Sequence, residues 1–357
     1  MNISFDDITR LLQELIKHSS YSKEEAQTAE IIESFFKNLN ISVQRKKNNV
    51  WARNLHYDVQ KPNVLLNSHH DTIRPRSDWT RDPFLPSIED GKIFGLGSND
   101  AGGPLVCLIA VFLQLYDRSD LSYNITFLAS AEEEISGRHG IEYILNDISN
   151  IDFGIVGEPT AMKMAIAEKG LLVLDCVAQG VSGHAARDIG NNAIYMALED
   201  INWIRNFEFP KVSQLLGPVK MTVTMIRSGS QHNVIPDRCE FVVDVRSTDL
   251  CSNDEVLSVI RKNMKSTVTP RSMRLQSSKI APDHILIKTA EELGISTFGS
   301  DTLSDQALLP FPTVKIGPGD PDRSHSADEY IWINDLKAGI KGYLQLLERI
   351  DHSLTRT

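Results

Sequence analysis

Short apolar runs, each followed closely by a cluster of polar residues, constrain the fold of this chain more than any other feature. The pairs are Val64–Ser68 before His69-His70-Asp71, Ile125–Ser130 before Glu132-Glu133-Glu134, Phe153–Val156 before Gly157-Glu158, and Thr313–Ile316 before Gly317-Pro318-Gly319-Asp320. Helix-like stretches, such as the one from Pro104 to Tyr116, lie between them. This alternation is typical of an α/β layer around a largely buried sheet. Because the carboxyl ends of parallel strands line one crevice, the polar clusters are expected to converge there.

The first forty residues predict two helices. The second follows Ser22-Lys23-Glu24-Glu25, which has the spacing of an N-terminal capping box. Apolar residues between Ala26 and Phe36 then recur with roughly helical periodicity. The N-terminal region therefore adds two helices to the α/β layer.

The stretch from about residue 168 to residue 278 has a different texture and predicts an inserted domain. Its expected order is strand, helix, strand, strand, helix, strand, over residues 171–178, 192–206, 220–226, 240–247, 253–265 and 271–276. This β-α-β-β-α-β order matches a ferredoxin-like sandwich. A helix near 284–293 then resumes the α/β pattern. We therefore expect one domain built from residues 1–167 and 279–357 and a second built from residues 168–278.

Composition argues against several classes of protein. The chain has 357 residues, with 37 Lys and Arg against 47 Asp and Glu, and a formal charge of −10. That acidity disfavours nucleic-acid binding, because phosphate backbones need clustered cations. The longest apolar run, Leu105–Leu113, is far short of the roughly 20 residues that span a bilayer, so no membrane partner is expected. The four cysteines lack CxxC spacing and the N-terminal segment lacks a secretory signal, which together predict a cytoplasmic protein.

Binding of a divalent metal is the chemistry that the polar clusters share. Asp100, in the glycine-rich segment Gly95–Gly103, adds another carboxylate ahead of an apolar helix. Each residue alone has a plainer explanation, such as a hydrogen-bonded turn, a helix cap or a solvated acidic turn. Their joint occurrence at strand and helix ends favours a metal site. Nitrogen and oxygen ligands without a thiolate suit zinc or cobalt.

Five ordered motifs resemble those of the M20 family of dinuclear zinc peptidases and deacylases. They are Ser68–Pro75, Phe94–Gly103, Glu132–Gly140, Val156–Thr160 and Gly317–Tyr330, the last being similar to the motif of acetylornithine deacetylases. The resemblance implies an α/β fold in which a mixed sheet flanked by helices forms the dinuclear-zinc catalytic domain. It implies that the inserted ferredoxin-like domain serves dimerisation, and that each subunit of a homodimer binds two Zn²⁺ or Co²⁺ ions.

The resemblance also assigns the metal ligands. His69 and Glu158 would bind one ion, Glu134 and His325 would bind the other, and Asp100 would bridge the two. Three carboxylates in one cleft would repel one another strongly in a low dielectric. Two divalent ions would offset that repulsion.

Three further residues are implied to support catalysis. Glu133 would be the general base; the family has Asp at the position of Glu132, so the register within the three glutamates stays open. Asp71 is expected to hydrogen-bond the ring of His69, which the H-x-D spacing favours over His70 as the ligand. His184 resembles the family histidine that reaches across a dimer to stabilise the oxyanion.

Substrate contacts are implied within the insert. Asn233 and Arg246 resemble the family's substrate-contact positions, and Arg suits a bidentate clamp on a carboxylate. The plainer interpretation of Arg246 is a strand-end ion pair with Asp244. The segment 301–305 is expected to line a side-chain pocket.

The implied reaction is hydrolysis of a small N-acyl-L-amino acid, most like N-acetylornithine or N-acetylcitrulline in arginine biosynthesis. A succinyl group in place of acetyl, as in succinyl-diaminopimelate desuccinylases, is a serious variant. A dipeptidase or aminopeptidase with the same site is the second enzymatic hypothesis. A metal-dependent binding module that has lost catalysis and a scaffold with acidic turns are the non-enzymatic hypotheses; the presence of Asp71, Glu133 and His184 argues against a lost activity.

Overall fold

The computed structural model describes residues 3–187 and 189–355, which divide into two compact units. Unit 1 consists of the chain up to Ile166, Ile280–Phe298 and the chain from Ser304; unit 2 consists of Ala167–Lys279 and Gly299–Leu303. The borders at 166/167 and 279/280 lie one residue from those expected from the sequence. The short segment Gly299–Leu303 belongs to unit 2, whereas the sequence placed it with the first domain.

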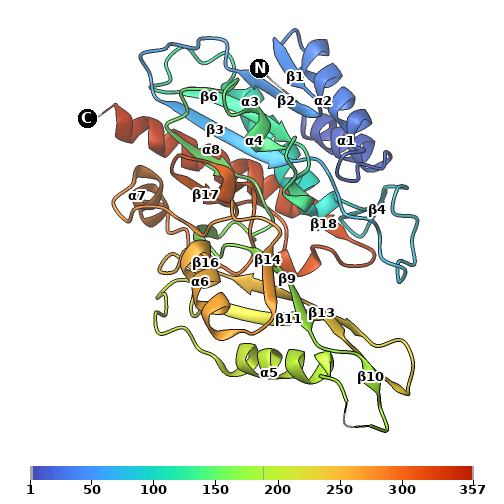
Figure 1. The fold of residues 1–357 in the computed structure, drawn as a ribbon. Helices are drawn as coiled ribbons and strands as arrows, with labels where there is room; N and C mark the ends of the chain where they lie inside the picture. The colour runs from blue at the N-terminus through green and yellow to red at the C-terminus, as the bar shows by residue number, and fades with distance from the viewer. Residues whose placement is uncertain (1–2, 188, 356–357) are drawn as a thin grey trace. The chain divides into compact units, whose positions relative to one another are not determined.

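A mixed sheet forms the centre of unit 1, and its order is β1-β2-β6-β3-β7-β17-β8 (Figure 1). The neighbours β6, β3, β7 and β17 are parallel, whereas β1, β2 and β8 pair in antiparallel fashion. A separate antiparallel sheet has the order β18-β5-β4. The strands are β1 (Val43–Lys46), β2 (Asn49–Arg53), β3 (Asn63–His69), β4 (Ser87–Glu89), β5 (Lys92–Phe94), β6 (Asn124–Ser130), β7 (Phe153–Val156), β8 (Met164–Glu168), β16 (Thr297–Ser300, beside β8), β17 (Thr313–Lys315) and β18 (Tyr330–Trp332).

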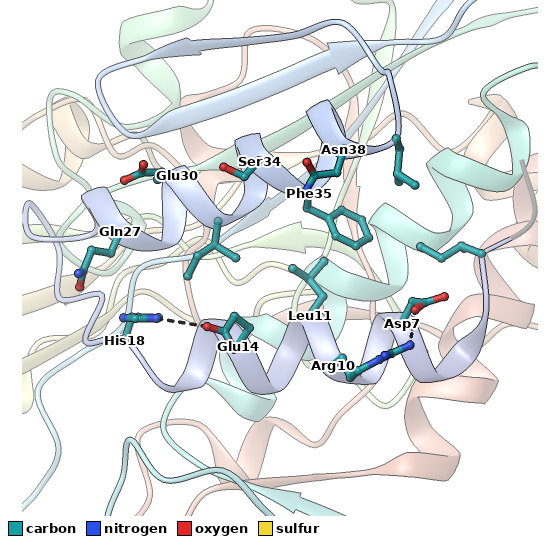
Figure 2. Close-up of a pocket in the computed structure, with 13 residues that line it drawn as sticks. Asp7, Arg10, Leu11, Glu14, His18, Gln27, Glu30, Ser34, Phe35 and Asn38 are labelled. Atoms are coloured by element: carbon teal, nitrogen blue, oxygen red, sulfur yellow. Dashed lines mark hydrogen bonds and ion pairs between the residues drawn. The ribbon is translucent and has the colours of Figure 1, made fainter.

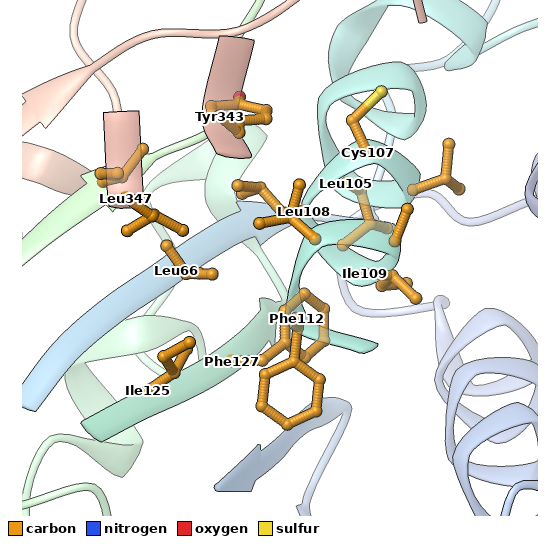
Figure 3. Close-up of a cluster of buried hydrophobic side chains, with 14 of the residues drawn as sticks. Leu66, Leu105, Cys107, Leu108, Ile109, Phe112, Ile125, Phe127, Tyr343 and Leu347 are labelled. Carbon is orange, nitrogen blue, oxygen red and sulfur yellow. The ribbon is translucent and has the colours of Figure 1, made fainter. Parts of the chain in front are cut away.

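Helices cover both faces of this sheet. The main core joins one face to α1, α2, α3, α7 and α8, and Figure 3 shows Leu108 and Phe112 of α3 beside Leu66 and Phe127 of the strands. The alternate residues Leu65 and Leu128 face α4 in a smaller core. The two-residue period of the strands therefore separates two apolar layers. The helices are α1 (Phe5–Ile16), α2 (Ala26–Asn38), α3 (Gly103–Leu115), α4 (Ile141–Ile144), α7 (Ile285–Glu292) and α8 (Ile333–Leu354).

The predicted capping box of α2 is wrong. Glu25 occupies the N-cap position without a side-chain cap, and the Ser22 hydroxyl donates instead to the Asp71 carboxylate at 2.7 Å. The competing acceptor lies 49 residues away, so local spacing could not reveal it. A complete capping box is found at α1, between Ser4 and Asp7.

One helical stretch in the described chain, Ser98–Leu115, is long and apolar enough to cross a membrane by length and composition. However, 83% of that stretch is buried inside the protein. The residues of α3 within it pack against β3, β6 and α8. Burial among protein elements explains its apolar character.

Unit 2 has the predicted β-α-β-β-α-β order, with an antiparallel sheet in the order β11-β13-β9-β14. The last strand is earlier than predicted: it spans Thr267–Pro270, where Val268 enters the core, and residues 271–276 lie outside any strand. Proline lacks the N–H that would continue the ladder. The elements are β9 (Leu172–Gln179), β10 (Gly183–His184), α5 (Ala193–Asn206), β11 (Lys220–Ser228), β12 (Val234–Ile235), β13 (Arg238–Arg246), α6 (Asn253–Asn263), β14 (Thr267–Pro270) and β15 (Ser278–Lys279, beside β8).

Candidate metal centre

The parallel strands deliver polar side chains to one edge of the unit 1 sheet, as the sequence predicts. His69 is the last residue of β3, and the three glutamates begin two residues after the end of β6. Glu158 lies two residues after β7, and His325 lies in the loop after β17. Tertiary structure thus brings together residues that span more than 250 positions of the sequence.

Asp100 lies between the two histidines, and its two carboxylate oxygens face different partners. Oδ1 is 3.2 Å from Nε2 of His69, and Oδ2 is 3.8 Å from Nε2 of His325. Glu158 Oε1 is 3.7 Å from the His69 nitrogen, and Glu134 Oε2 is 2.9 Å from the His325 nitrogen. These contacts arrange the predicted ligands as two candidate sets that share the Asp100 carboxylate.

The spacing of the side chains around His69 fits divalent metal ions. Zinc bonds to nitrogen and oxygen of about 2.0–2.2 Å place neighbouring ligand atoms about 3–4 Å apart. The ligand atoms of His69, Asp100 and Glu134 lie within 4.8 Å of one another, as do those of His69, Glu133 and Glu158. All are imidazole nitrogens or carboxylate oxygens, as expected for zinc or cobalt.

The electrostatics of the protein alone favour cations here. Burial, followed by the nearby Asp100, raises the pKa of Glu158 to about 8, and burial also raises the pKa of Glu134 above its usual value. Burial by itself would lower the pKa of His69, but the neighbouring carboxylates, Glu158 foremost, raise it well above its usual range. Without metal ions, these side chains therefore keep protons that offset part of the negative charge of the cluster. Bound cations would take over that role.

Glu133 is largely buried beside the cluster, with 11% of its side chain exposed, and lies farther from His69 than Asp100 and Glu158 do. Its Oε2 is 4.0 Å from Nε2 of His69. Burial raises the pKa of Glu133 well above its usual value. The general-base role of Glu133 stays a prediction, because its carboxylate also belongs to the group of possible ligand atoms formed with His69 and Glu158.

Asp71 contacts the His69 ring through its main chain as well as through the predicted carboxylate. The ring Nδ1 of His69 lies 2.9 Å from the backbone carbonyl of Asp71, whereas the Asp71 carboxylate is 3.5 Å away. That carboxylate accepts the backbone N–H groups of Glu133 and Glu134 at 3.0 and 3.2 Å. The main chain of Asp71 thus orients the candidate ligand His69, and its side chain orients the turn that carries the glutamates.

His70 contacts residues outside the cluster: its ring hydrogen-bonds Thr28 and Asn48, which agrees with its interpretation as a packed neighbour.

Two buried carboxylates near the cluster received no such role from the sequence. Asp305 accepts hydrogen bonds from Asn67 and Ser130, which lie near the carboxyl ends of β3 and β6. Glu329 accepts backbone N–H groups from the loop that carries Asp100. Glu329 lies inside the Gly317–Tyr330 motif. The signal that could have found it is an acidic residue directly before the apolar strand Tyr330–Trp332.

The predicted residues of the insert lie within unit 2, and two of them are neighbours. His184 pairs with Val234 across the β10–β12 ribbon, and the backbone carbonyl of Asn233 accepts from Ala185 at 3.0 Å. Arg246 makes a two-bond ion pair with Asp244, at 2.8 and 3.0 Å. The ion pair expected from spacing is therefore present, and the roles of His184, Asn233 and Arg246 toward a substrate stay predictions.

A cavity of about 730 Å³ lies elsewhere in unit 1, between α1 and α2 (Figure 2). Leu11 and Phe35 form part of its apolar floor, and its rim carries charged side chains such as Glu14 and Glu30. None of the predicted site residues lines it. The volume of a cavity therefore does not identify the candidate catalytic site of this chain.

Comparison with known proteins agrees with the geometry of the cluster. The profile of peptidase family M20/M25/M40 matches residues 65–349. This chain belongs to that family. It is therefore a metal-dependent hydrolase, and the resemblance of the five motifs is confirmed.

Relatives of this M20 chain cover nearly its full length at low identity. A succinyl-diaminopimelate desuccinylase of Wolbachia pipientis is 24% identical over 96% of this chain and 93% of its own. An acetylornithine deacetylase of Proteus mirabilis is 26% identical over 93% of each chain.

Solved structures of M20 proteins share the fold. A metallo-carboxypeptidase from Sulfolobus solfataricus aligns with a TM-score of 0.77 at 18% identity, covering 97% of this chain and 100% of its own. A dinuclear metal-binding peptidase from Bacillus subtilis aligns with a TM-score of 0.73 at 15% identity, covering 99% of each chain. The predicted α/β fold class is thereby confirmed.

Proposed function

We propose that this M20 chain hydrolyses the amide bond of a small N-acyl-L-amino acid. The observation that carries the proposal is Asp100, whose two oxygens face His69 and His325, with the largely buried Glu133 beside them. The deacetylase and desuccinylase names of relatives that span nearly the whole chain support an N-acyl-amino-acid substrate. N-acetylornithine or N-acetylcitrulline, in arginine biosynthesis in the cytoplasm, is the first candidate.

The residues divide the work of hydrolysis. His69, Glu158, Glu134, His325 and the shared Asp100 would hold two zinc ions. When bound, such ions polarise the amide carbonyl and lower the pKa of water. Glu133 takes a proton from the attacking water, whose oxygen bonds to the carbonyl carbon. The carbon–nitrogen bond then breaks, and Glu133 returns the proton to the leaving amine.

A succinylated substrate is the second candidate, and the name of the Wolbachia relative favours it. A cationic Arg246 would suit its additional carboxylate, but Asp244 already neutralises much of that charge. An experiment therefore has to distinguish acetylated from succinylated substrates.

A substrate panel tests both candidates. Protein reconstituted with Zn²⁺ is incubated with acetyl and succinyl derivatives of ornithine, citrulline and diaminopimelate, and with dipeptides, and the released primary amine is measured. We expect turnover of acylated amino acids to exceed that of dipeptides. Hydrolysis of dipeptides alone would replace this proposal with a dipeptidase.

We further propose that unit 2 pairs two copies of the chain. On α5, Tyr195 is 68% exposed and Leu198 is 50% exposed, one turn apart on the same face. The adjoining strand β11 lies at the edge of its sheet, with Met225 and Ile226 about half exposed. An apolar helix face beside an open strand edge supports self-association.

Leu198→Glu is expected to convert the dimer into a monomer, because it places a charge in the proposed apolar interface. Light scattering coupled to gel filtration measures the mass. Leu85→Glu is the matched control, since Leu85 is an exposed leucine of unit 1, and it should leave the mass unchanged. A dimeric Leu198→Glu protein would move the interface away from α5.

A further inference from the structure

The loop that carries Asp100 is held by a carboxylate from a distant part of unit 1. Glu329 is 2% exposed and lies four residues after His325. One of its oxygens accepts the backbone N–H groups of Asn99 and Asp100 at 2.7 and 2.9 Å, and the other accepts that of Gly97 at 3.0 Å. A single side chain therefore satisfies three buried donors of one loop.

The loop that carries Asp100 is also joined to the loop that carries His325 by a second set of contacts, at a residue that precedes His325 in the sequence. The amide group of Asn99 donates to the Asp320 carbonyl and accepts from the Asp320 backbone N–H, both at 3.0 Å. Asp320 precedes His325 and Glu329 follows it, so the loop carrying one candidate ligand is fixed at both ends to the loop carrying another.

The backbone of the Asp100 loop needs such a partner. Gly97 has a φ of +75°, and a side chain there would approach the Thr72 Cγ2 atom within 2.6 Å. This tight turn directs three N–H groups inward rather than into a helix or a sheet. Without an acceptor those buried donors would be unsatisfied, and the loop would be expected to rearrange.

From these contacts we propose that Glu329 is the positioning residue that holds Asp100 in its bridging orientation between His69 and His325. The proposal rests on the two-metal site of the proposed function and deepens it. Glu329 belongs to neither group of candidate ligand atoms in the described chain, so it acts through the backbone of Asp100. Its role is to preorganise the Asp100 carboxylate that would be shared by the two metal ions.

The test uses Glu329→Gln in the full chain, with Co²⁺ as the probe. Glutamine keeps the size of the side chain but places an NH₂ group against backbone donors. Calorimetric titration measures the affinity for each ion, and low-temperature electron paramagnetic resonance measures the magnetic coupling between two ions that share Asp100. We expect about 10- to 100-fold weaker binding of at least one ion, as for other residues that support metal ligands, and a loss of coupling.

Asp200→Asn is the matched control. Asp200 is a buried carboxylate of unit 2 that accepts the backbone N–H groups of Lys265 and Ser266 at 2.9 and 2.8 Å. Its substitution should lower the melting temperature and leave Co²⁺ affinity and coupling intact. Glu329→Asp, which keeps the charge but retracts the carboxylate by one methylene group, is measured as a second variant in case the glutamine variant does not fold.

The outcomes separate the two proposals. Parent-like Co²⁺ affinity and coupling in a folded Glu329 variant would overturn the positioning role, even with a lower melting temperature. A parent protein that does not bind two coupled Co²⁺ ions would instead overturn the two-metal site on which the role depends.

Discussion

Replacing Glu133 with alanine is expected to lower kcat about 100- to 10,000-fold, the usual contribution of a positioned general base. Asp100 and Glu158 lie 3.2 and 3.7 Å from Nε2 of His69, whereas Glu133 lies 4.0 Å from it. The longer separation suits a carboxylate that contacts water beside the metal site. Burial raises the pKa of Glu133 well above its usual value, which makes the carboxylate a stronger proton acceptor.

Metal content distinguishes the base from a ligand. Glu133→Ala should retain the parent number of metal ions by elemental analysis, whereas Glu134→Ala should lose metal because Glu134 pairs with His325 at 2.9 Å. If Glu133→Ala keeps parent turnover on the best substrate of the panel, the base assignment is wrong.

Glu132→Ala tests the register of the three glutamates. The Glu132 carboxylate accepts the backbone N–H of His139 at 3.3 Å and belongs to neither candidate ligand group among the described residues. A much smaller loss of kcat is therefore expected than for Glu133→Ala. A larger loss of kcat in Glu132→Ala than in Glu133→Ala would instead assign Glu132 as the general base.

The sequence could predict the metal cluster because one general rule of α/β sheets places it. The strands β6, β3, β7 and β17 are parallel, and each candidate ligand that follows one of them reaches the same sheet edge. Asp100 follows no strand of this sheet, so it was a candidate only from its glycine-rich segment ahead of an apolar helix, and its bridging role came from the motif resemblance. Ligand identity was thus accessible from strand ends and motifs together.

The supporting contacts were less accessible because they depend on tertiary structure. The Ser22 hydroxyl bonds Asp71 rather than capping α2, and Glu329 bonds a loop about 230 residues earlier in the sequence. Neither partner is visible in a local pattern. The interpretation of Arg271–Gln276 as a strand failed for a related reason, because burial of Val268 in the unit 2 core decided which segment pairs with β9.

Removing the metal ions is expected to abolish turnover and to lower the melting temperature. The free energy of unfolding gained from a ligand at 100 times its Kd is about 2.7 kcal/mol, which corresponds to about 5–10 °C for a unit of this size. Differential scanning calorimetry with and without a chelator measures the change. Equal melting temperatures would contradict a cluster of carboxylates that is stabilised by cations.

The pH dependence of the metal-free protein provides a sharper test. Burial raises the pKa of Glu158 from 4.5 in the unfolded chain to about 8 in the folded one, so the folded state holds the extra proton in this range. Stability conferred by that proton is complete below the lower pKa and is lost as pH rises toward about 8. The metal-free melting temperature should therefore fall as pH rises from 5 to about 8. The metal-loaded protein should lack this decline, because bound ions favour the deprotonated carboxylates and strengthen their binding as pH rises. Parallel pH profiles for the two forms would show that these carboxylates do not hold the ions.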